Sequence, residues 1–235
     1  MQALDLYASI EEYLDFEDEI HNLYKTIGHI VLSKELKNLI DIGCGQGEFC
    51  NIMNLNGLTT YGVDLSKKQI EIALKKDINV QCIDIKDVTS KYDCATATFD
   101  VLNYLDASQI NTFIQDTYNL LEKGGYFIFD VNSLYGFEEI AQGTLNIDTE
   151  DNFIAIDANY EEKILYTDIT LFEKVSELYN KTTGTIKQYY HSNNELSQAL
   201  KSSGFEIEEI IDFNLHSQNE HDKQIFICKK DYNDF

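Results

Sequence analysis

The segment Leu39–Glu48, with the sequence LIDIGCGQGE, limits the fold of this 235-residue chain more than any other feature. An apolar run, Asn38–Ile42, leads into a loop with glycines at positions 43, 45 and 47, and helical spacing follows over Glu48–Leu55. Glycine lets the backbone turn sharply and approach a ligand closely, and a helix N-terminus offers free N–H groups and positive potential. We therefore predict a strand, a ligand-binding loop and a helix in succession.

Strand and helix patterns alternate around this segment. Apolar and aromatic residues at helical spacing predict one or two helices within residues 5–36. Such alternation is typical of a parallel sheet with helices on both faces. The further predicted strands are Thr59–Val63, Asn79–Ile83, Tyr92–Thr98 and Tyr126–Asp130. Two further helices are predicted. One is capped by Ser66 and runs to Lys76, and the other covers Gln109–Leu121 and is ended by Gly124-Gly125.

The pattern changes after residue 143, where short strands separated by polar turns predict an antiparallel insertion of about fifty residues. Its expected strands are Phe153–Tyr160, Lys163–Glu173, Ser176–Asn180 and Thr185–Tyr190, with a hairpin turn at Thr182-Thr183-Gly184. A helix over Glu195–Ser202, ended by Gly204, and strands at Phe205–Phe213 and Gln224–Cys228 then return to the main sheet.

These elements predict a single domain of the α/β class. Its centre is a doubly wound, mostly parallel seven-stranded sheet, with the antiparallel β insertion after strand five. Residues 1–36 supply N-terminal helices, 37–143 the ligand-binding core, 144–190 the insertion, and 191–235 the C-terminal helix and strands. We expect the insertion to be a lid or wall of the site; the alternative is a dimer interface, since an exposed antiparallel sheet can pair with a copy.

The composition is strongly acidic, with 18 Lys+Arg against 41 Asp+Glu and a formal net charge of −23. All the basic residues are lysines, so bidentate guanidinium recognition of phosphate is absent. Nucleic acids and anionic membrane surfaces both attract clustered cations, and we expect neither as a partner. No apolar run approaches the roughly 18 residues of a membrane-spanning helix, and residues 1–24 lack a signal-peptide layout. A cytoplasmic protein, monomeric or homodimeric, is expected.

The five cysteines are scattered and include no C-x-x-C pair. We expect free thiols that act as small apolar side chains, and neither a disulfide framework nor a metal site.

Charges around the glycine loop favour a ligand that carries positive charge. The dinucleotide pattern G-x-G-x-x-G/A fits Gly43 and Gly45, but its third position falls on Glu48, whose carboxylate would face a pyrophosphate. Asp41 and Glu48 instead suit S-adenosylmethionine, which has a sulfonium, an ammonium and one carboxylate. Asp64 ends the second strand, where a carboxylate can accept both hydroxyls of a ribose. A nicotinamide-dependent oxidoreductase is the disfavoured alternative.

At this point the chain resembles class I S-adenosylmethionine-dependent methyltransferases, over about residues 35–135, and most of all their bacterial small-molecule branch. The segments that carry the resemblance are LIDIGCGQGE (39–48), YGVDLS (61–66), VQCIDI (80–85), YDCATATFDVLNYL (92–105) and LLEKGGYFIFDVNS (120–133). It implies a Rossmann-like methyltransferase fold. The cofactor residues that it implies are Gly43 and Gly45 at the methionine, Asp41 at its ammonium directly or through water, Asp64 at the ribose, Asp84 and Ile85 at the adenine, and Thr98 and Phe99 at the amino acid part, with Cys44 and Leu65 beside them.

Methyl transfer from a sulfonium needs aligned reactants, and a hydroxyl acceptor also benefits from a general base. The candidates are Asp100 and Tyr104 after strand four, and His191 where the insertion rejoins the fold. Their structural alternatives are a helix cap for Asp100, core packing for Tyr104 and a solvated loop for His191. Further expected wall residues are Asn132, Tyr7 and Tyr13, and the insertion tyrosines 160, 166, 179, 189 and 190.

The sequence thus predicts a methyltransferase that acts on the nitrogen or oxygen of a small polar metabolite, including a sugar or a nucleotide-linked precursor. The alternative is a non-catalytic partner protein that binds S-adenosylmethionine or S-adenosylhomocysteine.

Overall fold

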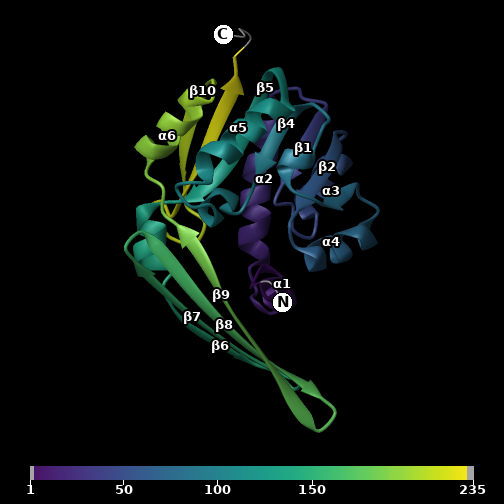
Figure 1. The fold of residues 1–235 in the computed structure, drawn as a ribbon, viewed down its shortest axis with the longest axis vertical. Helices are drawn as coiled ribbons and strands as arrows, with labels where there is room; N and C mark the ends of the chain where they lie inside the picture. The colour runs from purple at the N-terminus through teal and green to yellow at the C-terminus, as the bar shows by residue number, and fades with distance from the viewer. Residues whose placement is uncertain (1–2, 232–235) are drawn as a thin grey trace.

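The computed structural model describes residues 3–231, which build a seven-stranded sheet flanked by helices and a second, four-stranded sheet (Figure 1). The strand order of the large sheet is β10-β11-β5-β4-β1-β2-β3. All its pairs are parallel except those of β11, which runs antiparallel to both β10 and β5. The predicted fold class is confirmed. The strands are β1 Asn38–Ile42, β2 Thr59–Asp64, β3 Val80–Cys82, β4 Tyr92–Ala97, β5 Leu121–Asn132, β10 Phe205–Phe213 and β11 Lys223–Lys230.

Helices α4 and α6 begin after serines whose side chains cap them. The Ser66 hydroxyl accepts the N–H of Gln69 at 3.2 Å, as the predicted cap requires, and Ser192 and Glu195 form a reciprocal capping box. Within the described residues the helices are α1 Ala3–Ile10, η1 Glu11–Tyr13, α2 Glu17–Ser33, α3 Glu48–Leu55, α4 Lys67–Ala73, η2 Leu74–Lys76, η3 Ile85–Asp87, η4 Val101–Tyr104, α5 Ile110–Leu120, η5 Gly136–Ile140 and α6 Asn193–Ser202.

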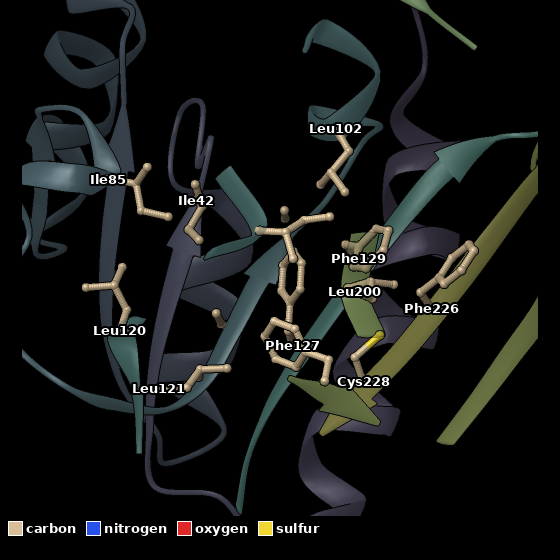
Figure 2. Packing of buried hydrophobic residues seen from close by; sticks show 14 of the residues in the cluster. Ile42, Ile85, Leu102, Leu120, Leu121, Phe127, Phe129, Leu200, Phe226 and Cys228 are labelled. Carbon is tan, nitrogen blue, oxygen red and sulfur yellow. The ribbon is translucent and has the colours of Figure 1, made fainter. Parts of the chain in front are cut away.

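Alternate residues of the central strands bury against different helices, because side chains in a strand point to opposite faces. Phe127 and Phe129 pack toward α5 and α6, while Ile128 packs toward α2 and α3. Figure 2 shows the first of these clusters, in which the ring centroids of Phe129 and Phe226 lie 4.9 Å apart. Helices therefore cover both faces of the sheet, so a ligand site is expected at the ends of the strands rather than on a face.

The predicted role of Gly124-Gly125 as the stop of helix α5 is wrong. The helix stops at Leu120 and β5 begins at the next residue, so Gly124-Gly125 lies inside the strand. Tyr92 pairs with Leu121 but Cys94 pairs with Tyr126, and the extra residues between them form an irregularity in which Gly124 has φ 75°. These glycines serve a bulge in a strand.

The insertion forms the predicted antiparallel sheet, in the order β6-β7-β8-β9. It extends away from the main body (Figure 1). The strands are β6 Gly143–Asp148, β7 Asn152–Glu161, β8 Ile164–Val175 and β9 Leu178–Tyr189.

Two details of the predicted insertion are wrong. Strand β6 had not been expected, and the two predicted final strands are one strand, β9. Thr182, Thr183 and Gly184 pair in register with β8, and the tight connection lies at Ser176, which has φ 57°. A side chain at position 184 would meet Leu6 of α1 at 3.1 Å, so this glycine allows the N-terminal helix to lie against the sheet.

Candidate active site

A cavity of about 1540 Å³ lies where the strands β1 to β5 reach their carboxyl ends, as expected for a parallel sheet. This volume exceeds the roughly 300–1,000 Å³ of a typical single-ligand pocket, which leaves room for two small molecules. The glycine loop and the ends of β2, β3 and β4 contribute to its wall. Asn132, the N-terminal segment 4–24 and residues 140–145, 156 and 158 contribute as well.

The structure brings most of the predicted cofactor residues to one side of this cavity. Their nearness in space follows from neighbouring parallel strands that end at one edge. The residues on its wall are Gly43, Cys44, Gly45, Asp64, Leu65, Asp84, Ile85, Thr98 and Phe99, and of the predicted set Asp41 is absent from the wall.

Four backbone N–H groups of the glycine loop, those of Gly43, Cys44, Gly45 and Gly47, are already used within the protein. Gly43 and Cys44 both donate to the carbonyl of Val63, at 2.8 and 3.0 Å. Gly45 donates to Asp64 Oδ2 at 2.9 Å, and Gly47 donates to the carbonyl of Cys44 at 2.8 Å. The loop therefore offers close approach rather than a cluster of donors for an anion.

Asp64 is anchored so that its carboxylate faces the cavity. One oxygen accepts the N–H of Gly45 and the other accepts the N–H of Ser66 at 2.7 Å. Burial raises the pKa of Asp64, and these backbone donors lower it in part. Each oxygen retains a further lone pair, which suits two hydroxyl donors from a ligand.

Asp41 lies behind the glycine loop. Its carboxylate is 1% exposed and accepts hydrogen bonds from Thr96 Oγ1 at 2.7 Å and Cys50 Sγ at 3.9 Å. Burial raises its pKa to about 7, with a further increase from the negative charge of Asp64. The structure does not place Asp41 on the cavity wall, so of the two forms that the resemblance implies, direct or through water, the water-mediated one stays a prediction.

Asp84 caps the short helix η3 while it lines the cavity. It accepts the N–H of Lys86 at 3.2 Å and pairs with Lys86 Nζ at 3.0 Å, and its pKa is lowered because these contacts outweigh desolvation. Ile85 is 8% exposed beside it, and Leu65 on the wall of the same cavity is 59% exposed. The cavity wall thus combines these two apolar side chains with the Asp84 carboxylate, a combination that suits a planar ring with a polar edge.

Strand β4 ends in a strained turn on the cavity wall. Phe99 and Asp100 have φ of 58° and 52°, a conformation that L-residues with side chains rarely adopt. Asp130, at the end of β5, accepts the N–H of Phe99 at 2.7 Å and that of Asp100 at 3.1 Å. Lys223, the first residue of β11, donates to Asp100 Oδ1 at 2.6 Å and Asp130 Oδ2 at 2.9 Å.

The predicted catalytic residues do not all meet in the cavity. Asp100 and Tyr104 lie on its wall, and burial raises the pKa of Tyr104. His191 does not line the cavity: it is buried, and its Nε2 lies 2.8 Å from the carbonyl of Leu105. It is therefore neither a solvated loop residue nor placed as a base.

The further predicted wall residues divide in the same way. Asn132 and Tyr7 line the cavity, whereas Tyr13 accepts a hydrogen bond from Asn152 of β7 at 2.9 Å. The insertion contributes Thr144, Leu145, Ile156 and Ala158 to the wall. The five predicted insertion tyrosines (160, 166, 179, 189 and 190) are absent from it.

Contacts from the N-terminal segment complete the site, and sequence reasoning missed them. Glu11 Oε2 accepts the side-chain amides of Gln46 at 3.0 Å and Gln69 at 2.8 Å. Asp5 Oδ1 accepts the hydroxyl of Ser66 at 2.6 Å. These bonds join α1 and η1 to the glycine loop and α4. Polar residues on an otherwise apolar helix face were the available signal, but their partners lie 35 or more residues away.

Comparison with known proteins decides the family. The model of a methyltransferase domain matches residues 13–210, most of the chain. The chain belongs to the methyltransferase domain family. A provisionally named methyltransferase of Geobacillus sp. (strain WCH70) is 28% identical over 216 residues, which cover 83% of this chain and 84% of that protein. The predicted class I S-adenosylmethionine-dependent family, and with it enzymatic rather than non-catalytic function, is confirmed.

Solved structures share the whole architecture. A S-adenosylmethionine-dependent methyltransferase from Clostridium acetobutylicum ATCC 824 superposes with a TM-score of 0.78 and 20% identity, over 96% of both chains. A sugar N-methyltransferase from Streptoalloteichus sp ATCC 53650 does so with a TM-score of 0.75 and 16% identity, over 97% of this chain and 92% of that one. Both similarities include the insertion, because the coverage is nearly complete.

The described residues were also expected to contain neither a membrane-spanning helix nor a metal site. No helix within residues 3–231 combines the length and apolar character that crossing a bilayer demands. Across the same range, His, Cys, Asp and Glu side chains do not come together in threes or more with the spacing of a metal site.

Proposed function

We propose that this methyltransferase transfers a methyl group from S-adenosylmethionine to the amine nitrogen of a small polar metabolite that carries no phosphate group. The observation that carries the proposal is the charge of the cavity wall. Eleven carboxylate side chains line it against three lysines, Lys76, Lys86 and Lys223. Such a wall attracts a cationic ligand and repels an anionic one.

Each of the three lysines already has a carboxylate partner. Lys76 Nζ lies 2.7 Å from Glu48, Lys86 Nζ 3.0 Å from Asp84, and Lys223 is shared between two aspartates. The chain has no arginine to add. A phosphorylated or nucleotide-linked acceptor would therefore lack an uncommitted lysine to pair with, and would face the remaining carboxylates.

The residues of the cofactor side fit the donor. Loop N–H groups that are already used do not favour a pyrophosphate, whereas close approach and nearby carboxylates suit a methionine part that bears a sulfonium and an ammonium. Asp64 would hold the ribose hydroxyls, Asp84, Ile85 and Leu65 the adenine, and the Thr98–Phe99 backbone the amino acid part. When bound, the cofactor supplies an already activated methyl group.

The acceptor side then has to orient the nucleophile and exclude water. Alignment of two reactants supplies about 7–11 kcal/mol of a barrier without further chemistry. Asp100 and Tyr104 lie next to the predicted methionine site, where a carboxylate and a hydroxyl can hold an amino group. Thr144, Leu145, Ile156 and Ala158 of the insertion line the same cavity, which supports the expectation that the insertion shapes acceptor choice.

The amine must be neutral when it reacts, so the carboxylates contribute by binding and the pH sets the reactive fraction. We expect turnover at saturating cofactor to rise with pH until the amine is deprotonated. The acidic wall displaces this rise to higher pH, because it stabilises the ammonium form.

A matched acceptor panel tests the proposal. The purified protein is incubated with methyl-labelled S-adenosylmethionine and D-glucosamine, D-glucose or D-glucosamine 6-phosphate, and then with a wider amine library, with detection by mass spectrometry. Labelled product is expected from unphosphorylated amines. Turnover of phosphorylated or nucleotide-linked acceptors at higher efficiency than of their unphosphorylated counterparts would refute the charge argument.

A further inference from the structure

We propose that Lys223 and Asp130 are positioning residues of the active site: together they hold the Phe99–Asp100 turn in the shape that the bound cofactor needs. Neither residue was among the candidates from the sequence, and neither belongs to the glycine loop. The inference rests on the proposed cofactor site but not on the identity of the acceptor.

The geometry places one carboxylate at the centre of the arrangement. Asp130 is fully buried, and its two oxygens accept the successive backbone N–H groups of Phe99 and Asp100 as well as Lys223 Nζ. Lys223 Nζ also lies 5.9 Å from the centroid of the Phe99 ring. The turn is thus held through its backbone by β5 and through the Asp100 carboxylate by β11.

The turn is strained where it is held. Two consecutive non-glycine residues in the left-handed region cost on the order of 1–3 kcal/mol each, and persist only where the surroundings impose them. Asp130 supports this shape, because its two carboxylate oxygens accept the N–H groups of Phe99 and Asp100. Strain of this kind gathers at functional sites.

Burial of the charged side chains of Lys223, Asp130 and Asp100 also costs free energy. The side chains of Lys223 and Asp130 are 4% and 0% exposed, and that of Asp100 is 14% exposed. Burial opposes the charge of Lys223, yet the two carboxylates raise its pKa above the ordinary value. A buried ion pair adds little to stability in comparison with apolar packing, so its position against the cavity points to a role in the site.

The same turn is linked to the insertion. Gln188 of β9 donates to Asp100 Oδ2, and Asn103 Nδ2 donates to the carbonyl of Tyr189 at 2.8 Å. Asn103 in turn accepts the N–H of Asn132 at 2.9 Å. One oxygen of Asp100 therefore accepts a hydrogen bond from Lys223 of the main sheet, and the other accepts one from Gln188 of the insertion. The position of the Asp100 carboxylate depends on both contacts.

Binding of S-adenosylhomocysteine, measured by calorimetry, tests the proposal without any acceptor. Asp130→Asn keeps the shape but replaces one acceptor oxygen by an amide that cannot accept an N–H, and Lys223→Met removes the cation. Each should weaken binding at least tenfold. Lys223→Arg, which restores the charge, should recover affinity to within about threefold of the wild type.

Two matched variants control for general damage. Asp93 Oδ2 also accepts two successive backbone N–H groups, those of Lys37 and Asn38 at 3.1 and 3.3 Å, but away from the cavity. Lys230, at the opposite end of β11, donates to the carbonyls of Tyr118 and Leu121. Asp93→Asn and Lys230→Met should lose stability in thermal melts yet bind S-adenosylhomocysteine as the wild type does.

The outcomes separate cleanly. Wild-type affinity in folded Asp130→Asn and Lys223→Met, or an equal loss in the two controls, would overturn the positioning role. If Lys223→Met does not fold, the isosteric Asp130→Asn decides by itself. Failure of the wild type to bind S-adenosylhomocysteine at all would instead reject the cofactor site on which the inference rests.

Discussion

Substitution of Asp41 by asparagine tests how the protein tolerates a carboxyl group buried behind the glycine loop. Asp41 is 1% exposed, and burial raises its pKa from 3.8 to about 7. Asparagine has nearly the same shape, can still accept the hydroxyl of Thr96, and does not ionise. Asp41→Asn therefore isolates the free energy of placing a negative charge at this position.

The sign follows from proton linkage. A carboxyl group whose pKa is raised on folding binds its proton more tightly in the folded state, so stability declines as the pH rises from about 4 to about 7. The interval from 3.8 to about 7 corresponds to about 4 kcal/mol at 1.36 kcal/mol per unit, as an upper value. Asp41→Asn should gain stability over the wild type progressively through this window and level off above pH 7.

Urea unfolding followed by far-ultraviolet circular dichroism between pH 4.5 and 8.5 measures the effect as a difference between the two proteins, in which all other titrating groups cancel. Asp84→Asn provides a control whose difference from the wild type should stay nearly constant over this range, because the pKa of Asp84 is lowered from 3.8 in the folded protein and the group is ionised throughout. A difference between Asp41→Asn and wild type that does not change with pH would show that Asp41 is not desolvated as the structure indicates.

Three further outcomes follow from the site. Asp64→Ala should weaken S-adenosylhomocysteine binding by about 1.5–3 kcal/mol, the range for charged hydrogen bonds, as measured by calorimetry; an unchanged Kd in a folded variant would remove Asp64 from the site. Glu11→Gln should weaken it a few-fold, since a neutral amide holds Gln46 and Gln69 less firmly; equal affinity would argue against the N-terminal contact. His191→Ala should cost about 1–3 kcal/mol of stability in urea unfolding and leave S-adenosylhomocysteine affinity within about twofold; abolished methyl transfer with full stability would instead support a catalytic histidine.

Local patterns in the sequence predicted the main sheet well. Apolar runs bounded by glycine or polar residues correspond to β1, β2, β4, β10 and β11 within a few residues. The errors arose at glycine and polar residues, which occur both at the ends of helices or in turns and within paired strands. Gly124-Gly125 is read as a helix stop, but Leu121 already pairs with Tyr92, and only that distant partner shows that the strand has begun. Polar and glycine residues at 182–184 suggest a turn, yet β8 continues to pair with them.

The site was predictable only in part, because some of its contacts join residues that lie far apart in the sequence. Asp64 and Gly45 meet because neighbouring parallel strands end at the same edge of the sheet, and this rule applies to any parallel sheet. Asp41 lies one residue before Ile42, on the opposite face of β1, and points toward Cys50 of α3, so the motif alone does not indicate its place behind the cavity wall. The partnership of Lys223 with Asp100 spans 123 residues, and no local pattern indicates it.

The insertion and the N-terminal helix act on the site as one unit. Leu6 and Ile10 of α1 pack with Ile154 and Ile186 of the insertion, and the same N-terminal segment reaches the glycine loop through Glu11. The insertion is joined to the turn after β4 by separate hydrogen bonds from β9. Hence the wall of the proposed acceptor side cannot move without disturbing contacts on the cofactor side. Substitution of Leu6, Ile10, Ile154 or Ile186 by alanine should therefore alter S-adenosylhomocysteine affinity, although none of these four side chains lines the cavity.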